Sequence, residues 1–255
     1  MINNSKIMSM ANRSLKGFRL HAAGTSILWG ILIAAVAITI NIICVLFLDD
    51  NEHSSRNYLI SFVSEMIQSI IMHMFIIGFY AYFYCVYKQK KASLKLLFAG
   101  FRNFSRNVVV LIIGALVMGF FTTVAEVTMQ HYLDNYSVEE NIAFYIILAI
   151  VYIAILCLVC YKLYPTWLAL MLKMSMDDST NAIDLIRQTY RQVSVYNYNF
   201  LFLYFRFLGW SIVGCLTLGI GFLWILPYLT TATVVFFDII FKPEDYAAPE
   251  DPAIQ

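Results

Sequence analysis

Charged residues are scarce in this sequence. Only 13% of its 255 residues are Asp, Glu, Lys or Arg, whereas about 25% is typical of a soluble domain. The hydrophobic fraction of 61% is well above the usual value of about 45–50%, so water cannot be the solvent for the whole surface. The formal net charge of +1 excludes a strongly basic or acidic molecule, and no nucleic-acid partner is expected.

Motifs that carry catalysis are also missing. The sequence has no G-x-S-x-G, H-E-x-x-H or Walker-type loop. His73 has no second histidine at ligand spacing, and Cys157 and Cys160 enclose only apolar residues, so no metal site and no redox pair is expected. All five cysteines lie in or near apolar runs and are interpreted as small hydrophobic residues: Cys44, Cys85, Cys157, Cys160 and Cys215. The sequence therefore predicts a protein that is not an enzyme and has no cofactor.

Long apolar stretches dominate what is present. A transmembrane helix needs roughly 20 apolar residues, and six stretches meet this length, at 26–48, 60–87, 107–130, 142–164, 198–218 and 222–241. Pro165 is expected to kink or end the fourth stretch, with a bent or interfacial extension after it. The prediction is an all-α integral membrane bundle of about six transmembrane helices. An interfacial segment over 1–25 precedes this domain over 26–241, and a disordered tail over 242–255 follows it.

The distribution of cations predicts the orientation. Cations gather before the first stretch, between the second and third and between the fourth and fifth, at Lys6, Arg13, Lys16, Arg19, Lys88, Lys90, Lys91, Lys95, Arg102, Arg106, Lys162, Lys173, Arg187 and Arg191. The opposite loops hold Arg56 against the acids Asp49, Asp50, Glu52, Asp134, Glu139 and Glu140. Because cytoplasmic loops carry the excess of Lys and Arg, both termini are expected in the cytoplasm.

Amphipathic surface helices are expected on the cytoplasmic side. Residues 180–193 follow Asp177 and Asp178 as a polar helix, and its expected apolar face consists of Ile183, Ile186, Tyr190 and Val193. Two similar tetrapeptides, Lys16-Gly17-Phe18-Arg19 and Ala99-Gly100-Phe101-Arg102, precede the first and third stretches. They are either parts of a threefold repeat of one surface helix and two spans, or ordinary basic and aromatic sequences at a membrane interface.

A few polar residues fall inside the apolar stretches. Ionisable groups at membrane depth are costly and usually face protein or water. The expected intramembrane polar cluster consists of Glu65, Gln68, His73, Glu126 and Arg206. Arg206 is expected to counter Glu126 or Glu65, either as a packing pair or in a water-filled ligand cavity, with exposure at the interface as a third alternative. Asp238, near the inner end of the sixth stretch, is expected to cap or hydrogen-bond there, or to attract a cytoplasmic partner.

The C-terminal third carries a more specific pattern. It consists of Phe207-Leu208-Gly209-Trp210, Leu216-Thr217-Leu218-Gly219-Ile220-Gly221, Leu223-Trp224-Ile225-Leu226-Pro227-Tyr228 and Phe236-Phe237-Asp238. Upstream stand Leu94 to Phe101, Tyr164-Pro165, Asp177-Asp178 and Ala182-Ile183. Together these motifs resemble a Gram-positive bacterial multi-pass membrane protein family of unknown function (domain of unknown function, family number 975). The resemblance implies a bacterial plasma membrane and no particular activity.

Three functions are compatible with these patterns. The first is an accessory, regulatory or immunity-type factor that binds a membrane partner or an amphipathic ligand. Its basic surface segments suit the lipid bilayer, anionic lipids, a membrane protein partner or a homo-oligomer. The alternative is a transporter or channel for a small or amphipathic solute, with a polar cavity between spans two, three and five. A third reading is an intramembrane enzyme using Glu65, His73 and Glu126.

Overall fold

The computed structural model describes residues 3–47, 55–89, 92–117 and 142–247, and no strand occurs among them. The elements in order are α1 (Asn4–Leu15), α2 (Arg19–Phe47), α3 (Ser55–Tyr87), the 3-10 helix η1 (Leu94–Phe101), a helix over Phe104–Val117, α5 (Ile142–Met176), α6 (Ala182–Val193), η2 (Ser194–Tyr196), α7 (Asn197–Leu216), α8 (Phe222–Phe241) and α9 (Glu244–Ala247). The predicted all-α class is confirmed.

Four helical segments of the described chain are long and apolar enough to cross a membrane: Arg19–Phe47, Ile60–Tyr87, Ala182–Leu216 and Phe222–Phe241. A fifth candidate is the pair of helices Leu94–Phe101 and Phe104–Val117, which is bent by 71°. The expected third span is described only as far as residue 117. Four or five candidate spans are therefore found, and six spans with cytoplasmic termini stay a prediction.

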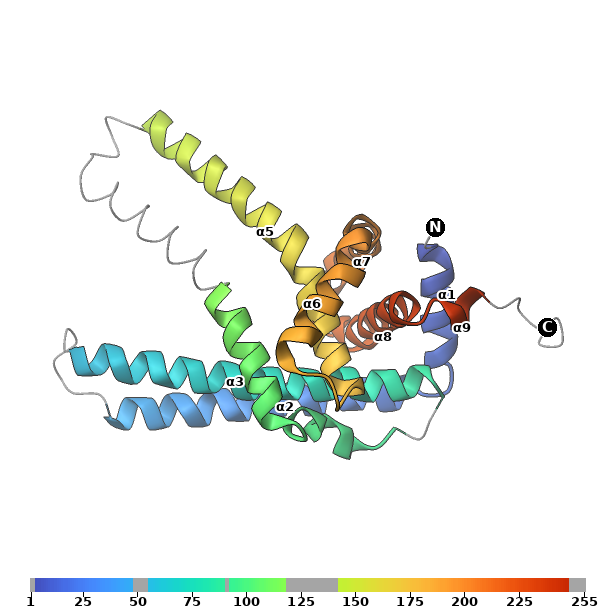
Figure 1. The fold of residues 1–255 in the computed structure, drawn as a ribbon, viewed down its shortest axis with the longest axis horizontal. Helices are drawn as coiled ribbons and strands as arrows, with labels where there is room; N and C mark the ends of the chain where they lie inside the picture. Colours follow the sequence, from blue (N-terminus) through green and yellow to red (C-terminus); the bar gives the residue numbers. More distant parts are fainter. Residues whose placement is uncertain (1–2, 48–54, 90–91, 118–141, 248–255) are drawn as a thin grey trace.

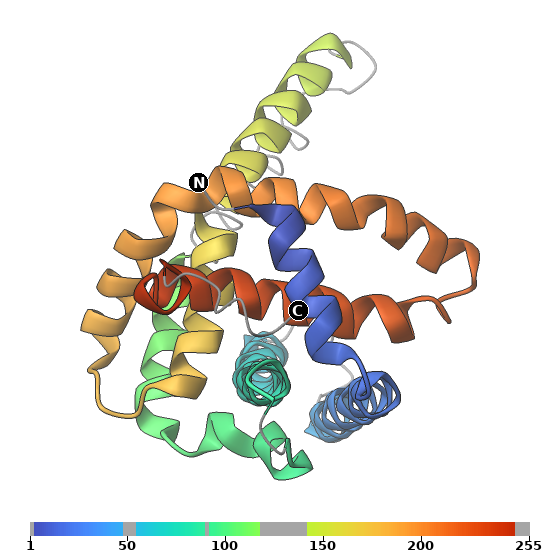
Figure 2. The ribbon, with the colours of Figure 1, turned by 90° about the vertical axis from the view of Figure 1, so that its right-hand side faces the viewer.

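The long helices diverge from a common hub. In Figure 1, α2 and α3 extend side by side to the left, while Phe104–Val117 and α5 extend to the upper left. Figure 2 shows α2 and α3 end-on, with α7 and α8 crossing the view to the right. The helices thus leave the hub in three directions.

The hub contains the hydrophobic core, and the C-terminal half of α8 lies at its centre. Every residue from 230 to 238 is buried, and α8 contacts α1, α2, α3, α5, α6 and α7. The rings of Phe200 and Phe237 stack there at 5.4 Å between centroids. By contrast, none of the apolar window of α2 is buried within the protein. Such an apolar exterior is consistent with lipid as its solvent.

Two details of the helices refine what the sequence predicts. Of the expected kink or end at Pro165, the end is not seen, because α5 continues through it to Met176. Proline is tolerated in helices of this kind when neighbouring groups satisfy the freed backbone. In α6 the buried residues are Leu185, Thr189 and Val193, whereas Ile183 and Tyr190 of the expected apolar face are exposed. The helix has apolar residues on two adjacent faces, and the face that repeats every four residues packs into the hub.

The expected disorder of the tail does not hold for its first part. Glu244–Ala247 forms α9, and the Tyr246 hydroxyl donates a hydrogen bond to Met10 Sδ. The Lys6 ammonium lies 5.0 Å from the centroid of the Tyr246 ring. These contacts join the C-terminal end of the described chain to α1.

Two glycines allow α3 and η1 to meet backbone to backbone. A Cβ at Gly78 would lie 1.9 Å from the Leu97 carbonyl oxygen, and a Cβ at Gly100 would lie 2.1 Å from that of Met74. Gly100 belongs to the Leu94 to Phe101 motif, so close packing explains its presence there. No side chain fits at either position without moving the helices apart.

Replacing Gly78 with alanine is expected to destabilise the protein, because the new methyl group would overlap backbone atoms of η1. Overpacking usually costs about 1–3 kcal/mol, and backbone atoms yield less than side chains. Gly30→Ala in α2 is the matched control, since nothing lies within 4 Å of its Cβ position. Thermal unfolding in detergent measures both, and equal midpoints would refute the close contact.

Candidate functional site

The structure separates the predicted polar residues. Glu65 is exposed on α3, while Gln68 accepts a hydrogen bond from Asn41 Nδ2 of α2 at 3.3 Å. Glu126 lies outside the described residues. No ion pair joins Glu65 to Arg206 within the described part of the chain, so that pairing is not seen.

Arg206 has other partners. Its Nη1 donates to Ser5 Oγ at 2.8 Å and lies 3.8 Å from Met8 Sδ, both on α1. Its side chain is exposed, and the helix that carries it, α7, packs against α1 and α8. Pairing of Arg206 with Glu126 stays a prediction.

His73 lies in a pocket that the sequence did not predict. The cavity has a volume of about 420 Å³, and we call it the α3–α5 pocket. It is bounded by Met66, Ser69, Ile70 and His73 of α3; Val110, Leu111, Ile112, Ile113, Gly114, Ala115 and Val117 of the Phe104–Val117 helix; Leu163, Tyr164, Thr166, Trp167 and Leu170 of α5; and Ile186 and Tyr190 of α6. Most of this lining is apolar, and α7 contributes no residue to it.

The back of the α3–α5 pocket is tightly packed. A Cβ at Gly114 would lie 2.0 Å from the Trp167 ring, so the indole rests directly on the glycine. The Trp167 ring also meets the His73 ring edge-on, at 5.5 Å between centroids. His73 Nδ1 lies 2.7 Å from the Ser69 carbonyl oxygen. Because a carbonyl can only accept, the contact selects a ring with the proton on Nδ1, and in the tautomer with that one proton Nε2 is an acceptor.

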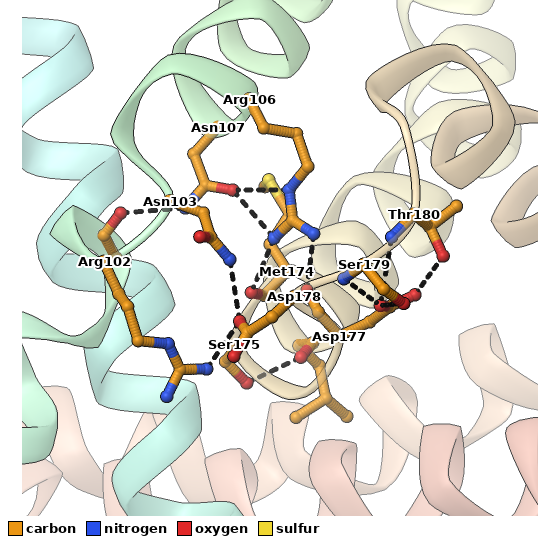
Figure 3. Close-up of polar contacts among 12 residues, drawn as sticks. Arg102, Asn103, Arg106, Asn107, Met174, Ser175, Asp177, Asp178, Ser179 and Thr180 are labelled. Carbon is orange, nitrogen blue, oxygen red and sulfur yellow. Dashed lines mark hydrogen bonds and ion pairs between the residues drawn. The ribbon is translucent and has the colours of Figure 1, made fainter.

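A polar cluster joins two walls of the α3–α5 pocket, the Phe104–Val117 helix and α5 (Figure 3). Arg106 donates from Nη1 to the Asp177 carbonyl and from Nη2 to the Met174 carbonyl, the latter at 3.1 Å. The last carbonyls of a helix lack partners within it. A cation at this end also interacts favourably with the negative end of the helix dipole. Asn107 Nδ2 donates to the Gly100 carbonyl at 2.8 Å. The start of the Phe104–Val117 helix is thereby joined to both α5 and η1.

Acidic residues complete this cluster. Asp178 Oδ1 accepts from Arg102 Nη2 at 2.6 Å and from Asn103 Nδ2 at 2.7 Å, but both charges are half exposed and such pairs contribute little stability. Hydrogen bonds from the Thr180 and Ser179 groups lower the pKa of the Asp177 carboxyl from 3.8 to about 2. The charged Asp177 therefore shapes the turn that leads into α6.

Asp238 forms the most buried ion pair of the described residues. Its Oδ2 lies 2.6 Å from Lys88 Nζ, at the C-terminal end of α3, and its side chain is 5% exposed. The Lys88 ammonium also lies 4.8 Å from the centroid of the Tyr87 ring. The other carboxylate oxygen, Oδ1, is buried without a hydrogen-bond partner in the described structure. The expected hydrogen-bonding role for Asp238 is thus seen, with Lys88 as its partner.

Sequence reasoning missed most of these contacts. It counted Arg102 and Arg106 only as cytoplasmic charge. The two residues are four positions apart and precede an apolar stretch, and this spacing is one signal that they act together on one face of a helix. Their partners, the Asp178 carboxylate for Arg102 and the Asp177 backbone carbonyl for Arg106, lie more than 70 positions away. Among the described residues, no group of three or more His, Cys, Asp or Glu side chains could hold a metal ion.

Comparison with known proteins gives one match. A family model described as "Protein of unknown function (DUF975)" matches residues 1–244. No curated protein and no solved structure matches the chain.

Replacing Lys88 with methionine is expected to destabilise the protein strongly, because the buried Asp238 carboxylate would lose its counter-charge. Breaking a buried pair costs about 3–5 kcal/mol, reduced here because the Lys88 side chain is 27% exposed. Lys88→Met combined with Asp238→Asn should regain part of the loss. Thermal unfolding in detergent measures all variants, with the exposed Lys95→Met as control. A double variant no more stable than Lys88→Met would contradict the pairing.

Proposed function

The chain belongs to the DUF975 family of proteins of unknown function, and from this premise we propose that it is a non-enzymatic membrane protein that binds an amphipathic ligand. The observation that carries the proposal is the α3–α5 pocket. Its volume of about 420 Å³ falls within the range of about 300–1,000 Å³ that is usual for ligand sites. A mostly apolar lining with a few polar groups is also usual for such sites.

The dimensions of the α3–α5 pocket favour a single apolar chain. It runs along α3 from Met66 to His73, which is roughly 10 Å at the rise of a helix. Leu163 to Leu170 of α5 line a similar length of the opposite wall. This space suits part of one alkyl chain better than a folded partner domain.

His73 indicates the chemistry of the ligand's head group. With the Nδ1 proton engaged by the Ser69 carbonyl, Nε2 can accept one hydrogen bond from a ligand. A hydroxyl or amine would supply that donor, while the chain packs against Trp167 and the isoleucines of the Phe104–Val117 helix. The proposed ligand is therefore an amphipathic molecule with a long alkyl chain and a donor head group.

The polar cluster of Figure 3 supports a preformed site. Arg106 and Asn107 join three elements that border or adjoin the α3–α5 pocket, so the walls do not need to assemble when the ligand arrives. Preorganisation lowers the free-energy cost of binding. An accessory, regulatory or immunity-type role in a bacterial plasma membrane, with both termini cytoplasmic, completes the proposal.

The transporter alternative has less support. It needed a polar cavity between spans two, three and five, whereas the α3–α5 pocket is mostly apolar and has no wall from α7. Arg206, which would have charged such a cavity, is bound to α1.

Ligand binding is expected to quench the fluorescence of Trp167. The probe is a long-chain alcohol with a nitroxide on its chain, added to the full chain in phosphatidylcholine nanodiscs. The other three tryptophans, Trp29, Trp210 and Trp224, are replaced by phenylalanine. Quenching should saturate, and Ala115→Phe, which fills the pocket, should weaken binding at least about tenfold, equivalent to a loss of roughly 1.4 kcal/mol.

Two controls make this experiment decisive. Ala34→Phe places the same ring on the exposed face of α2 and should leave binding unchanged. The methyl ether of the probe lacks the donor, so it should bind more weakly than the alcohol, and His73→Leu should remove that difference. Quenching that rises without saturation, or equal binding by the two phenylalanine variants, would reject the proposed function.

A further inference from the structure

A second cavity lies on another side of the hub. Its volume is about 300 Å³, and it opens between α1, the start of α2, and the α7–α8 pair. Six lining residues carry its chemistry: Asn12, Arg19, Phe207, Trp210, Trp224 and Tyr228. Four of these, Phe207, Trp210, Trp224 and Tyr228, belong to the C-terminal motifs of the sequence, so residues of separate motifs gather around one space. We call it the Arg19 pocket.

The Arg19 pocket offers hydrogen-bond donors that the protein does not use. The Arg19 guanidinium donates from Nη2 to Asn12 Oδ1 at 2.6 Å, which leaves most of its five N–H groups free. Arg19 forms no ion pair with any acid in the described chain. The indole N–H groups of Trp210 and Trp224 likewise have no acceptor among the described residues. The Tyr228 hydroxyl already donates to the Met8 carbonyl at 3.3 Å.

Charge and shape together define the ligand. An uncompensated guanidinium with neighbouring N–H donors matches the oxygens of a phosphate ester. The Trp210 and Trp224 side chains are about half exposed, and tryptophan prefers the level of lipid head groups. The cavity brings both to Arg19 at the start of α2, whereas the predicted six-span order would put the α7–α8 turn at the opposite membrane face. A head-group site here therefore requires this turn to meet the head groups on the Arg19 side. Arg19 is also the first residue of the 29-residue apolar helix α2, so its charge is next to the proposed hydrocarbon boundary. A free anion would use the guanidinium but not the aromatic walls.

We propose that the Arg19 pocket binds the head group of one anionic phospholipid. The phosphate lies at Arg19 and Asn12, and the glycerol and upper acyl carbons lie against Trp210, Trp224 and Phe207. This site is separate from the α3–α5 pocket and shares no residue with it. It would hold a lipid beside the α1–α2 turn, where Gly17 has a left-handed φ of 89°.

Brominated lipids test this directly, because bromine quenches tryptophan on contact. A full-length chain with Trp29→Phe and Trp167→Phe retains only Trp210 and Trp224. It is placed in phosphatidylcholine nanodiscs that contain increasing brominated phosphatidylglycerol or, in parallel, brominated phosphatidylcholine. Brominated phosphatidylglycerol should quench at a roughly fivefold lower mole fraction, as expected from about 1 kcal/mol per cation near an anionic surface.

Variants then assign the preference to this pocket. Arg19→Gln should make the two lipids equal, whereas Arg19→Lys should keep part of the preference. Asn12→Asp places a carboxylate beside Arg19 at an exposed position and should also remove the preference for phosphatidylglycerol. This variant keeps the test informative if Arg19→Gln does not fold. Arg191→Gln, an exposed cation on α6, should change nothing.

Three results would overturn the proposal. Equal quenching of the parent protein by both lipids would show that the pocket does not select charge. An unchanged preference in Asn12→Asp and Arg19→Gln would place the selectivity elsewhere. Loss of the preference on adding inorganic phosphate at constant ionic strength would show that the pocket takes a free anion and not a lipid.

Discussion

The direct contact between the backbones of α3 and η1 is the constraint on which the rest of the structure depends. Gly78 and Gly100 lack the side chains that would hold these segments apart. Since the Phe104–Val117 helix begins just after η1, this contact decides where that helix starts, and Asn107 returns a hydrogen bond to Gly100. The position of Arg106 against the end of α5, and with it the α3–α5 pocket, follows from this approach.

Burial in this protein is concentrated where the helices converge. The hub is packed with aromatic and aliphatic side chains around α8, while the outer lengths of α2 and α3 carry exposed isoleucine, valine and phenylalanine. Exposing so many apolar side chains to water would be unfavourable, whereas contact between these side chains and lipid tails is not. The divergence of the helices leaves their apolar sides free for lipid or for a ligand of similar chemistry. Both pockets open beside the hub, where rigid packing meets these apolar surfaces.

Local features were predictable from the sequence, and contacts between distant residues were not. The bounds of α8 agree with the predicted sixth stretch, since a glycine-containing turn precedes it and Lys242 follows it. The apolar residues of α6 cover two sides, so the sequence did not indicate which side packs into the hub, and only packing selects Leu185 over Ile183. The α3–α5 pocket and the Arg106 cluster need the spatial meeting of segments far apart in the sequence, such as His73 with Trp167 and Arg106 with Asp177, which no periodicity encodes. Asp238 was identified as notable, but its partner Lys88 lies 150 positions away.

The central position of α8 has a consequence for biogenesis. A ribosome makes the chain from the N-terminus onward, and α8, around which the hub packs, follows the other long helices of the described chain. Until residues 230–238 emerge, Lys88 has no carboxylate beside it and the inner ends of the earlier helices have nothing to enclose. A chain that stops before α8 would keep its apolar helices but lack the residues around which their inner ends pack. The hub can therefore close only after α8 has been made, however early the preceding helices form.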